Sequence, residues 1–406
     1  ELVIYLNGGH RLVPVEKAGL ASLTAEMLNE STQKRSSEQL SQALEMLGST
    51  VDFSASEYQS TIKVSALTEH LDETLAILEE KLFMPAFDEA DFTRVKQQQL
   101  QQIQHMQSDP SYQANAALYS LLYGNNNALG VSDAGTLDSV AALTLADVKA
   151  FYAEQYRGAN AKIITVANLP ESALLPKLAG LSKWQGEASV LPPLKSFPAL
   201  KGGTIYVIDK PGAAQSVINI AKRALPYDAT GNYFKSYLMN YPLGGAFNSR
   251  INLNLRENKG YTYGARTSFS GAGEAGEFIA SSDVRTDVTA KALNEFIKEI
   301  KAYQQQGMTD VELTFMRNSV SQGQALDYET PYQKAGFMRM IQRYQLSQDF
   351  TTEQDKIINT VTKDELNALA ASELDISQMI ILVVGDKAKI EADLATLGYP
   401  IETLVL

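Results

Sequence analysis

Two stretches, "LTLADVKAFYAEQYRGANAKIITVANL" (143–169) and "VTKDELNALAASELDISQMIILVVGDK" (361–387), align without a gap at an offset of 218 residues. Each has a threonine at its second position and an acid three residues later, which is typical of a capped helix start. Each then runs into a continuous apolar segment, which is typical of a buried strand. The pair therefore predicts one helix–strand unit that occurs twice in the chain.

Two further pairs of segments support an internal repeat. Residues 70–82 match residues 288–300 at the same offset, with apolar residues in matching positions. Residues 87–99 match residues 308–320 after a slip of three residues, and each segment opens a further helix. Three pairs in the same order along the chain indicate a duplicated domain.

The segment between the two copies reads as a linker. "SKWQGEASVLPPLKSFPALKGG" (182–203) contains three prolines and flanking glycines, which suit an extended connection. We therefore predict a first domain over 1–181, a linker over 182–203 and a second domain over 204–406. The strand-like "TIYVID" that opens the second copy has no counterpart in the first at this offset. We expect its counterpart to lie upstream of Glu1.

The secondary structure expected within each copy fixes the fold class. Strand hairpins and long helices occur in both copies, but strands do not alternate regularly with helices. This pattern predicts an α+β fold with two tandem homologous domains. Each domain would contain an antiparallel or mixed sheet with helices packed on one face.

Composition excludes several classes of protein. The net charge of −12 and the pI near 4.9 argue against nucleic acid or an anionic membrane surface as a partner. No apolar run is long enough for membrane insertion. The chain has no cysteine, which excludes disulfides and thiolate metal sites and favours a bacterial periplasm, with a cytoplasmic location as the alternative. Its first residues resemble no signal peptide, so we expect a mature product or a fragment.

The densest candidate for a functional site is "LGGAFNSRINLNLRENKGYTYGARTSF" (243–269). A helix is expected to begin at Asn248 or Ser249 and to end before Gly260. The helix would bury Ile251 on the same face as the leucine four residues later.

Charge and tyrosines set this segment apart from the rest of an acidic chain. The alternation in "YTYGARTSF" predicts a strand with Tyr261 and Tyr263 on the same face. The segment also carries four basic residues against a single acid. They are Arg250, Arg256, Lys259 and Arg266, and the acid is Glu257. Arginine and tyrosine can together donate hydrogen bonds to carbonyl or carboxylate oxygens. A basic surface turn is the alternative, and composition alone favours it.

The motif "LGGAFNSRINLNLRENKGYTYGA" closely resembles the signature of the pitrilysin/insulinase family of inverted zinc metallopeptidases. In that family a helix ending in Leu-Arg-Glu is followed by a glycine and then by a tyrosine seven residues after the arginine. Here these positions are Arg256 and Tyr263. The resemblance extends over essentially the whole chain, including the duplicated domains, and is shared with mitochondrial processing peptidase and with bacterial two-subunit or fused members.

The resemblance also explains "GLASLTAEM" (19–27). Active members carry a helix of pattern G-x-A-H-x-x-E-H-M, in which two histidines bind zinc and the glutamate activates water. This chain has Ser22 at the first histidine, Ala25 at the glutamate and Glu26 at the second histidine. The family's third ligand is a glutamate expected within 92–106, where this chain has no acid. The resemblance therefore implies a degenerate zinc site, no cofactor in this chain, and zinc in a partner half.

Members of the family work as two such halves that close around a peptide. The resemblance implies that this chain is the zinc-free half, inactive alone, with a zinc-bearing homologous half as a fused or separate partner and unfolded peptides as substrates. Tyr263 would then stabilise the oxyanion, and Arg256 would hold a substrate carbonyl. The alternative is a catalytically inert scaffold or assembly subunit. The presence of both residues at the family's spacing favours the first interpretation.

Overall fold

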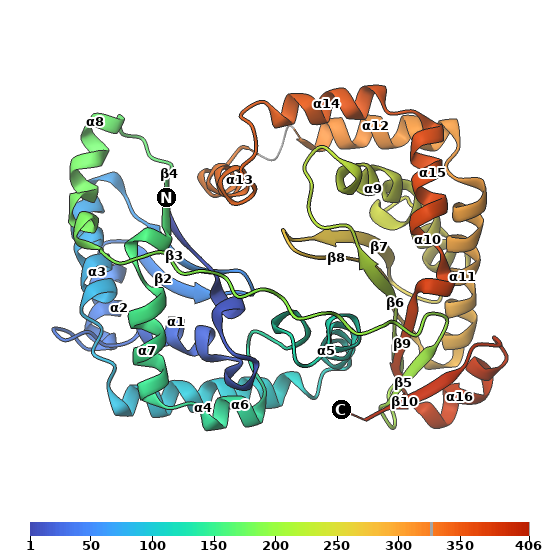
Figure 1. The fold of residues 1–406 in the computed structure, drawn as a ribbon, viewed down its shortest axis with the longest axis horizontal. Coiled ribbons are helices and arrows are strands. Elements are labelled where there is room, and N and C mark those ends of the chain that lie inside the picture. The colour runs from blue at the N-terminus through green and yellow to red at the C-terminus, as the bar shows by residue number, and fades with distance from the viewer. Residues whose placement is uncertain (325–327, 406) are drawn as a thin grey trace. The chain divides into compact units, whose positions relative to one another are not determined.

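The computed structural model describes residues 1–324 and 328–405 of the 406-residue chain (Figure 1). The chain forms two compact units, each built around its own sheet. Unit 1 comprises Glu1–Met106, Tyr123–Phe197 and Tyr328–Arg339, and unit 2 comprises Gln107–Leu122, Pro198–Asp327 and Met340–Leu406.

The sheet of unit 1 has four strands in the order β2-β3-β1-β4, and every neighbouring pair is antiparallel. The strands are β1 (Leu2–Asn7), β2 (Thr50–Ala55), β3 (Gln59–Ser65) and β4 (Ala161–Thr165). Within the described residues this sheet ends at β4. The predicted upstream counterpart of "TIYVID" stays a prediction.

Helices cover one face of this sheet (Figure 1). They are α1 (Leu20–Asn29), α2 (Ser37–Met46), α3 (Leu71–Phe83), α4 (Glu89–Met106), α6 (Leu137–Ala142) and α7 (Leu145–Gln155), and the short α8 (Glu171–Leu174) buries none of its residues. The alternation of β1 explains the two-faced packing, because Ile4 joins the helical core while Tyr5 points to the opposite face. On that opposite face, Tyr5 lies in a small cluster with Ile164 and Ala335.

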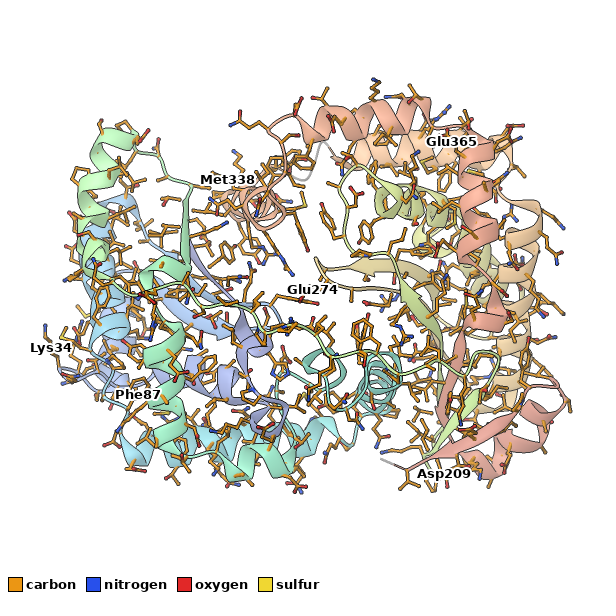
Figure 2. All side chains as sticks on the ribbon, in the orientation of Figure 1. Lys34, Phe87, Asp209, Glu274, Met338 and Glu365 are labelled. Carbon is orange, nitrogen blue, oxygen red and sulfur yellow. The ribbon has the colours of Figure 1, made fainter. Side chains whose placement is uncertain are left out.

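The sheet of unit 2 is mixed and has six strands in the order β10-β5-β9-β6-β8-β7. The strands are β5 (Ile205–Asp209), β6 (Gln215–Ala224), β7 (Ala265–Gly271), β8 (Gly276–Arg285), β9 (Ile380–Gly385) and β10 (Ile401–Leu404). β5 is parallel to both β9 and β10, and the other pairs are antiparallel. β7 and β8 form a hairpin whose tip carries Glu274 (Figure 2).

One face of this second sheet packs on a helical core that includes Leu293 and Phe296, both fully buried. The helices placed mainly in unit 2 are α5 (Pro110–Tyr123), α9 (Asn232–Asn240), α10 (Arg250–Asn252), α11 (Thr289–Gln306), α12 (Asp310–Gln324), α14 (Phe350–Thr360), α15 (Lys363–Glu373) and α16 (Lys387–Ala395). Helix α13 (Pro331–Tyr344) contributes its first nine residues to unit 1 and the rest to unit 2.

The structure confirms the α+β fold and the repeat. Helices α7 and α15 occupy matching positions at the 218-residue offset, and each begins at a threonine that forms a capping box, Thr144 and Thr362. Each is followed by a strand, β4 or β9, that pairs antiparallel with the first long strand of its unit. Helices α3 and α11 also match at this offset, and α4 and α12 match after the three-residue slip.

The two copies do not correspond simply to the two compact units. α5 and α13 are both 14-residue helices that begin with a proline, and they match at an offset of 221 residues. Nearly all of α5, from the first copy, belongs to unit 2, whereas the first nine residues of α13, from the second copy, belong to unit 1. The boundaries 1–181, 182–203 and 204–406 therefore stay a prediction about the repeat.

Candidate functional site

The degenerate zinc helix lies in unit 1 as α1. It begins after Gly19, whose φ of +93° favours glycine, and the amide of Leu23 donates to the carbonyl of Gly19. The hydroxyl of Ser22 donates to the backbone carbonyl of Asp133 at 3.0 Å. Ala25 is buried. Neither side chain offers a free electron pair of the kind that zinc prefers.

Glu26 is the one potential ligand on this helix. Burial of its carboxyl group raises its pKa, the nearby charges of Asp52 and Glu30 raise it further, and a hydrogen bond with Asn29 partly offsets the rise. On α4, the amide of Gln99 donates to Gly19 and Ala134 carbonyls. No group of three or more His, Cys, Asp or Glu side chains that could hold a metal exists among the described residues. The residues present do not fit a catalytic zinc ion.

The Arg/Tyr segment lies in unit 2 between α9 and β7. It contains two wide π-helical turns, η7 (Tyr241–Gly245) and η8 (Leu253–Asn258), on either side of the short α10. Such turns are rare and occur frequently at functional sites. As predicted, Ser249 occupies the N-cap position of α10, although its hydroxyl does not cap the helix.

Burial and termination of this helical segment follow the sequence pattern. Ile251 and Leu255 are both fully buried, which anchors the segment on the core of unit 2. Gly260 has a φ of +61°, and its amide donates to the carbonyl of Arg256, so the turn ends there as predicted. Arg256 is thereby placed in the last turn before the tyrosine segment.

The expected strand at Tyr261 and Tyr263 is wrong, because β7 begins only at Ala265. The hydroxyl of Thr262 accepts from the amide of Gly264 and lies 2.7 Å from the carbonyl of Asp283 on β8. This side chain thus takes the place of a backbone pairing and holds the tyrosines in a loop. Tyr261 packs partly against the core, whereas the side chain of Tyr263 is 92% exposed.

The basic residues of the segment have different environments. Arg250 makes a two-pronged ion pair with Glu312, with one N–O distance of 2.6 Å, and stacks on the ring of Tyr303. Arg250 is therefore part of the framework. The guanidinium of Arg256 lies 4.6 Å from the ring centroid of Phe247 and 3.3 Å from the carboxylate of Glu257. Its side chain is 35% exposed.

A cavity of about 820 Å³ lies within unit 2 beside this segment. Its lining comprises Ser111, Asn115, Val217, Asn219, Gly244, Gly245, Ala246, Phe247, Asn252, Tyr263, Gly264, Ala265, Arg266, Ser268, Ile279, Ser281, Ser282 and Asp283. Tyr263 and Phe247 are exposed aromatic residues on this wall, with Phe247 66% exposed. Arg256 is joined to the wall through its stacking on Phe247.

The chemistry of the cavity wall is mostly neutral and polar, with hydroxyls and amides beside a few apolar groups. Arg266 and Asp283 supply the charges. Burial raises the pKa of Asp283, the charge of Asp109 adds to the rise, and the charge of Arg266 opposes it. A wall of this kind suits a ligand that offers backbone amides and carbonyls and that covers aromatic side chains.

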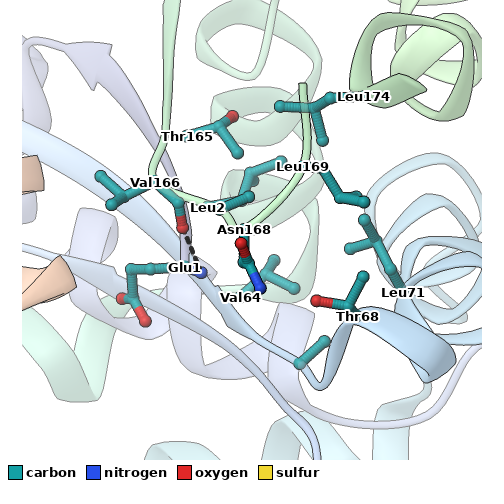
Figure 3. A pocket seen from close by; sticks show the side chains of 12 residues that line it. Glu1, Leu2, Val64, Thr68, Leu71, Thr165, Val166, Asn168, Leu169 and Leu174 are labelled. Atoms are coloured by element: carbon teal, nitrogen blue, oxygen red, sulfur yellow. Dashed lines mark hydrogen bonds between the residues drawn. The ribbon is translucent and has the colours of Figure 1, made fainter. Parts of the chain in front are cut away.

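A second cavity, of about 120 Å³, lies in unit 1 between the end of β4 and the start of β1 (Figure 3). Apolar side chains such as Leu2, Leu169 and Leu174 line much of it, and the α-ammonium group of Glu1 donates to the carbonyl of Val166. Its volume is far below that of a typical ligand pocket. We assign it no function.

Sequence reasoning named Arg256 and Tyr263 but missed other members of the site. Ser111 and Asn115 reach the cavity from α5, more than 120 residues before β7. Phe247 and Asn252 fall within the quoted motif, yet only the folded segment shows that Phe247 stacks with Arg256 and that Asn252 is buried beneath it. The available signal for Phe247 was its position, since a large aromatic residue stands between the Gly244-Gly245 pair and the start of the helix.

Comparison with known proteins agrees with this architecture. Residues 1–132 match the family model described as insulinase (peptidase family M16), and residues 142–320 match the one described as peptidase M16 inactive domain. The chain belongs to peptidase family M16, the pitrilysin/insulinase family, and it is a homologue of the inactive type.

Relatives over nearly the full length support the same placement. The chain is 24% identical over 387 residues to a Helicobacter pylori protein named non-peptidase homolog YmxG, covering 94% of this chain and 88% of the relative. It is 21% identical to an uncharacterized zinc protease of Mycobacterium leprae, covering 90% and 82%.

Solved structures show the same fold. A peptidase M16 inactive domain from Pseudomonas fluorescens superposes with a TM-score of 0.85 at 23% identity, covering 95% of this chain and 92% of that one. The periplasmic protease PqqL of Escherichia coli superposes with a TM-score of 0.76 at 14% identity. That match covers 94% of this chain and 42% of PqqL.

Proposed function

We propose that this chain is the zinc-free half of an M16-type endopeptidase, in which the cavity of unit 2 holds a substrate peptide. The observation that carries the proposal is the exposure of Tyr263 on the cavity wall, together with the stacking of Arg256 on Phe247, which lines the same cavity. Neither functional side chain is taken up by the framework, in contrast to Arg250. Both groups are therefore available to a ligand.

The chemistry proposed for the pair is hydrogen bonding to peptide oxygens. The phenol of Tyr263 would donate to the oxyanion that forms when a peptide bond is attacked, and Arg256 would bind a neighbouring backbone carbonyl. Loss of one oxyanion donor typically costs about 2.7–4 kcal/mol of transition-state stabilisation. A side chain that is 92% exposed can be removed at this site without loss of stability.

The nucleophile must come from elsewhere, because the residues of α1 do not fit zinc. We propose a homologous half that holds zinc and supplies the activated water, either as a separate chain or fused in the natural protein. PqqL, of which this chain matches 42%, offers a fold precedent for a longer protein. Unfolded peptides are the proposed substrates, since the neutral polar wall suits backbone groups. We propose the periplasm as the compartment, on the absence of cysteine and on the description of PqqL.

No helix among the described residues is both long enough and apolar enough to span a bilayer. The first experiment is affinity capture of the chain from its native source through a C-terminal tag, with intact masses and zinc content of the eluate. A zinc-bearing homologous half in the eluate supports the proposal, and elution of this chain alone, metal-free and inert, contradicts it.

The second experiment substitutes the pair in the captured assembly. Arg256→Ala and Tyr263→Phe are expected to lower kcat for an unfolded peptide by about 10²–10³-fold, as for loss of an oxyanion donor. Tyr261→Phe is the matched control, because Tyr261 is outside the cavity lining and packs partly on the core. Hydrolysis unchanged in both variants would exclude the catalytic role.

An inert scaffold is the second candidate function. The name of the Helicobacter pylori relative, non-peptidase homolog, and the inactive-domain family model favour it. A scaffold would keep the assembly together when Arg256 and Tyr263 are replaced, with no change in turnover. The same variants therefore separate the two candidates.

A further inference from the structure

The two sides of the candidate site are joined by one buried side chain. The side-chain amide of Asn252 donates to the backbone carbonyl of Phe247 at 2.7 Å, and its oxygen accepts from the backbone amide of Ala265 at 3.0 Å. Asn252 is 4% exposed and lies on the cavity wall. One hydrogen bond therefore holds the backbone of Phe247, whose ring stacks with Arg256. The other holds Ala265, two residues after Tyr263.

These contacts matter because the side chains that the two segments carry are exposed. Phe247 lies between η7 and α10, with its ring 66% exposed, and it carries the guanidinium of Arg256. Tyr263 lies in the loop before β7, and its side chain is 92% exposed. Neither side chain is fixed by burial, so the backbone must fix their relative positions.

The amide of Asn252 also has both its groups satisfied inside a buried setting, where an unpaired donor or acceptor is costly. A fixed acceptor at Phe247 and a fixed donor at Ala265 set a single spacing between the two segments. We propose that Asn252 is a positioning residue that holds Arg256, through Phe247, and Tyr263 at the spacing needed to bind one peptide. This inference rests on the proposed function for the roles of Arg256 and Tyr263.

A second asparagine provides a matched control. The amide of Asn240 donates to the carbonyl of Thr267 at 2.8 Å, and its oxygen accepts from the hydroxyl of Thr267 at 2.6 Å. Asn240 is 3% exposed, so it resembles Asn252 in burial and in making two hydrogen bonds, but both of its bonds are with Thr267 on β7. It contacts neither Phe247 nor Ala265 through these bonds and is outside the cavity lining.

The first test is hydrogen exchange of the full chain, measured by mass spectrometry. Asn252→Ala is expected to raise exchange by about tenfold or more, both over residues 246–249 and over residues 262–266, because a buried hydrogen bond is lost on each side. Asn240→Ala is expected to leave both windows unchanged. Unchanged exchange in Asn252→Ala, or an equal rise in Asn240→Ala, would overturn the inference.

Asn252→Asp tests the two hydrogen bonds one at a time. It also provides a second variant in case the alanine variant fails to fold. A carboxylate still accepts from the amide of Ala265, but it cannot donate to the carbonyl of Phe247. Exchange is therefore expected to rise over 246–249 and to stay unchanged over 262–266. A rise on both sides, or on neither, would contradict the division of roles between the two bonds.

The last measurement connects this geometry to function in the captured assembly, with a fluorescein-labelled tryptic digest of β-casein as substrate. Asn252→Ala is expected to lower kcat/KM by about tenfold or more, with Asn240→Ala near the wild type. If exchange changes as expected while Arg256→Ala and Tyr263→Phe leave turnover unchanged, the proposed function fails. The placement of the two segments by Asn252 then stands alone as a structural role. The positioning role would be overturned if Asn252→Ala raised exchange over 246–249 and 262–266 but left kcat/KM unchanged, in an assembly whose turnover does depend on Arg256.

Discussion

The side-chain amide of Asn29 makes two hydrogen bonds of 2.9 Å with the backbone of Phe53, one to its amide and one to its carbonyl. Asn29 is the last residue of α1, and Phe53 lies on β2, the edge strand of the first sheet. In the second unit Asn240, the last residue of α9, bonds Thr267 on the edge strand β7. Each unit thus ties one residue of a sheet-edge strand to a helix-terminal asparagine, which occupies backbone groups that could otherwise pair with a further strand.

Asn29→Ala is expected to destabilise the chain and to open this edge. The amide and carbonyl of Phe53 would lose their partners, and we expect the free energy of unfolding to fall by roughly 2 kcal/mol. Urea denaturation measures the fall, and size-exclusion chromatography with light scattering detects self-association through the exposed edge. Asn29→Asp keeps the acceptor and should show a smaller loss. An alanine variant as stable and monomeric as the wild type would contradict the edge-closing role.

Arg250 and Arg256 are expected to differ sharply in their effect on stability. Arg250 is paired with Glu312 in a partly buried bridge and also donates to the carbonyl of Gly307. Burial raises the pKa of Glu312, but the hydrogen bonds from Arg250 and Thr309 outweigh this and lower it overall.

Arg250→Ala should therefore lower the free energy of unfolding by about 3 kcal/mol, because it leaves a partly buried carboxylate unpaired. Arg256→Ala should change it by less than about 0.5 kcal/mol, since its contacts are at the surface. Thermal and urea unfolding of both variants measure the difference. Equal losses would show that Arg256 belongs to the framework as well.

Local sequence patterns predicted much of the fold because they act over a few residues. The threonine caps at Thr144 and Thr362, the buried pair Ile251 and Leu255, and the stop at Gly260 all depend on helix geometry alone. The repeat predicted from the sequence is also present in the structure, because matching helices and strands occur in both units.

The site was only partly predictable, because its remaining features depend on distant contacts. Alternation placed Tyr263 on a strand, but the side chain of Thr262 bonds to the carbonyl of Asp283, and the strand begins only at Ala265. Charge count could not distinguish Arg250 from Arg256, since Glu312 lies 62 residues from Arg250 in the sequence. Nor does any local pattern bring α5 to the cavity wall.

Metal removal is expected to affect this chain and its proposed zinc-bearing partner differently. The residues on α1 do not fit zinc, so a chelator such as EDTA is expected to leave the Tm of the isolated chain unchanged. In the captured assembly the same treatment should abolish peptide hydrolysis, and added zinc should restore it. Elemental analysis of the isolated chain provides the control. One equivalent of zinc in that chain, with a Tm that falls on chelation, would contradict the degenerate site.

Stability is expected to fall in mild acid because of His10. This residue is 1% exposed, and burial lowers its pKa below the ordinary value of 6.5, with the charge of Asp133 partly opposing the shift and that of Arg11 adding to it. Above pH 6.5 the imidazole is neutral in both the folded and the unfolded chain, so it costs nothing. As the pH falls below 6.5, the unfolded chain takes up the proton first, and the free energy of unfolding decreases until the folded-state pKa is passed. Each tenfold weakening of proton binding in the folded chain corresponds to about 1.4 kcal/mol. Urea unfolding between pH 7.5 and 5 should therefore show a steeper loss in the wild type than in His10→Gln, whose side chain does not titrate, and parallel profiles would show that other groups govern the acid sensitivity.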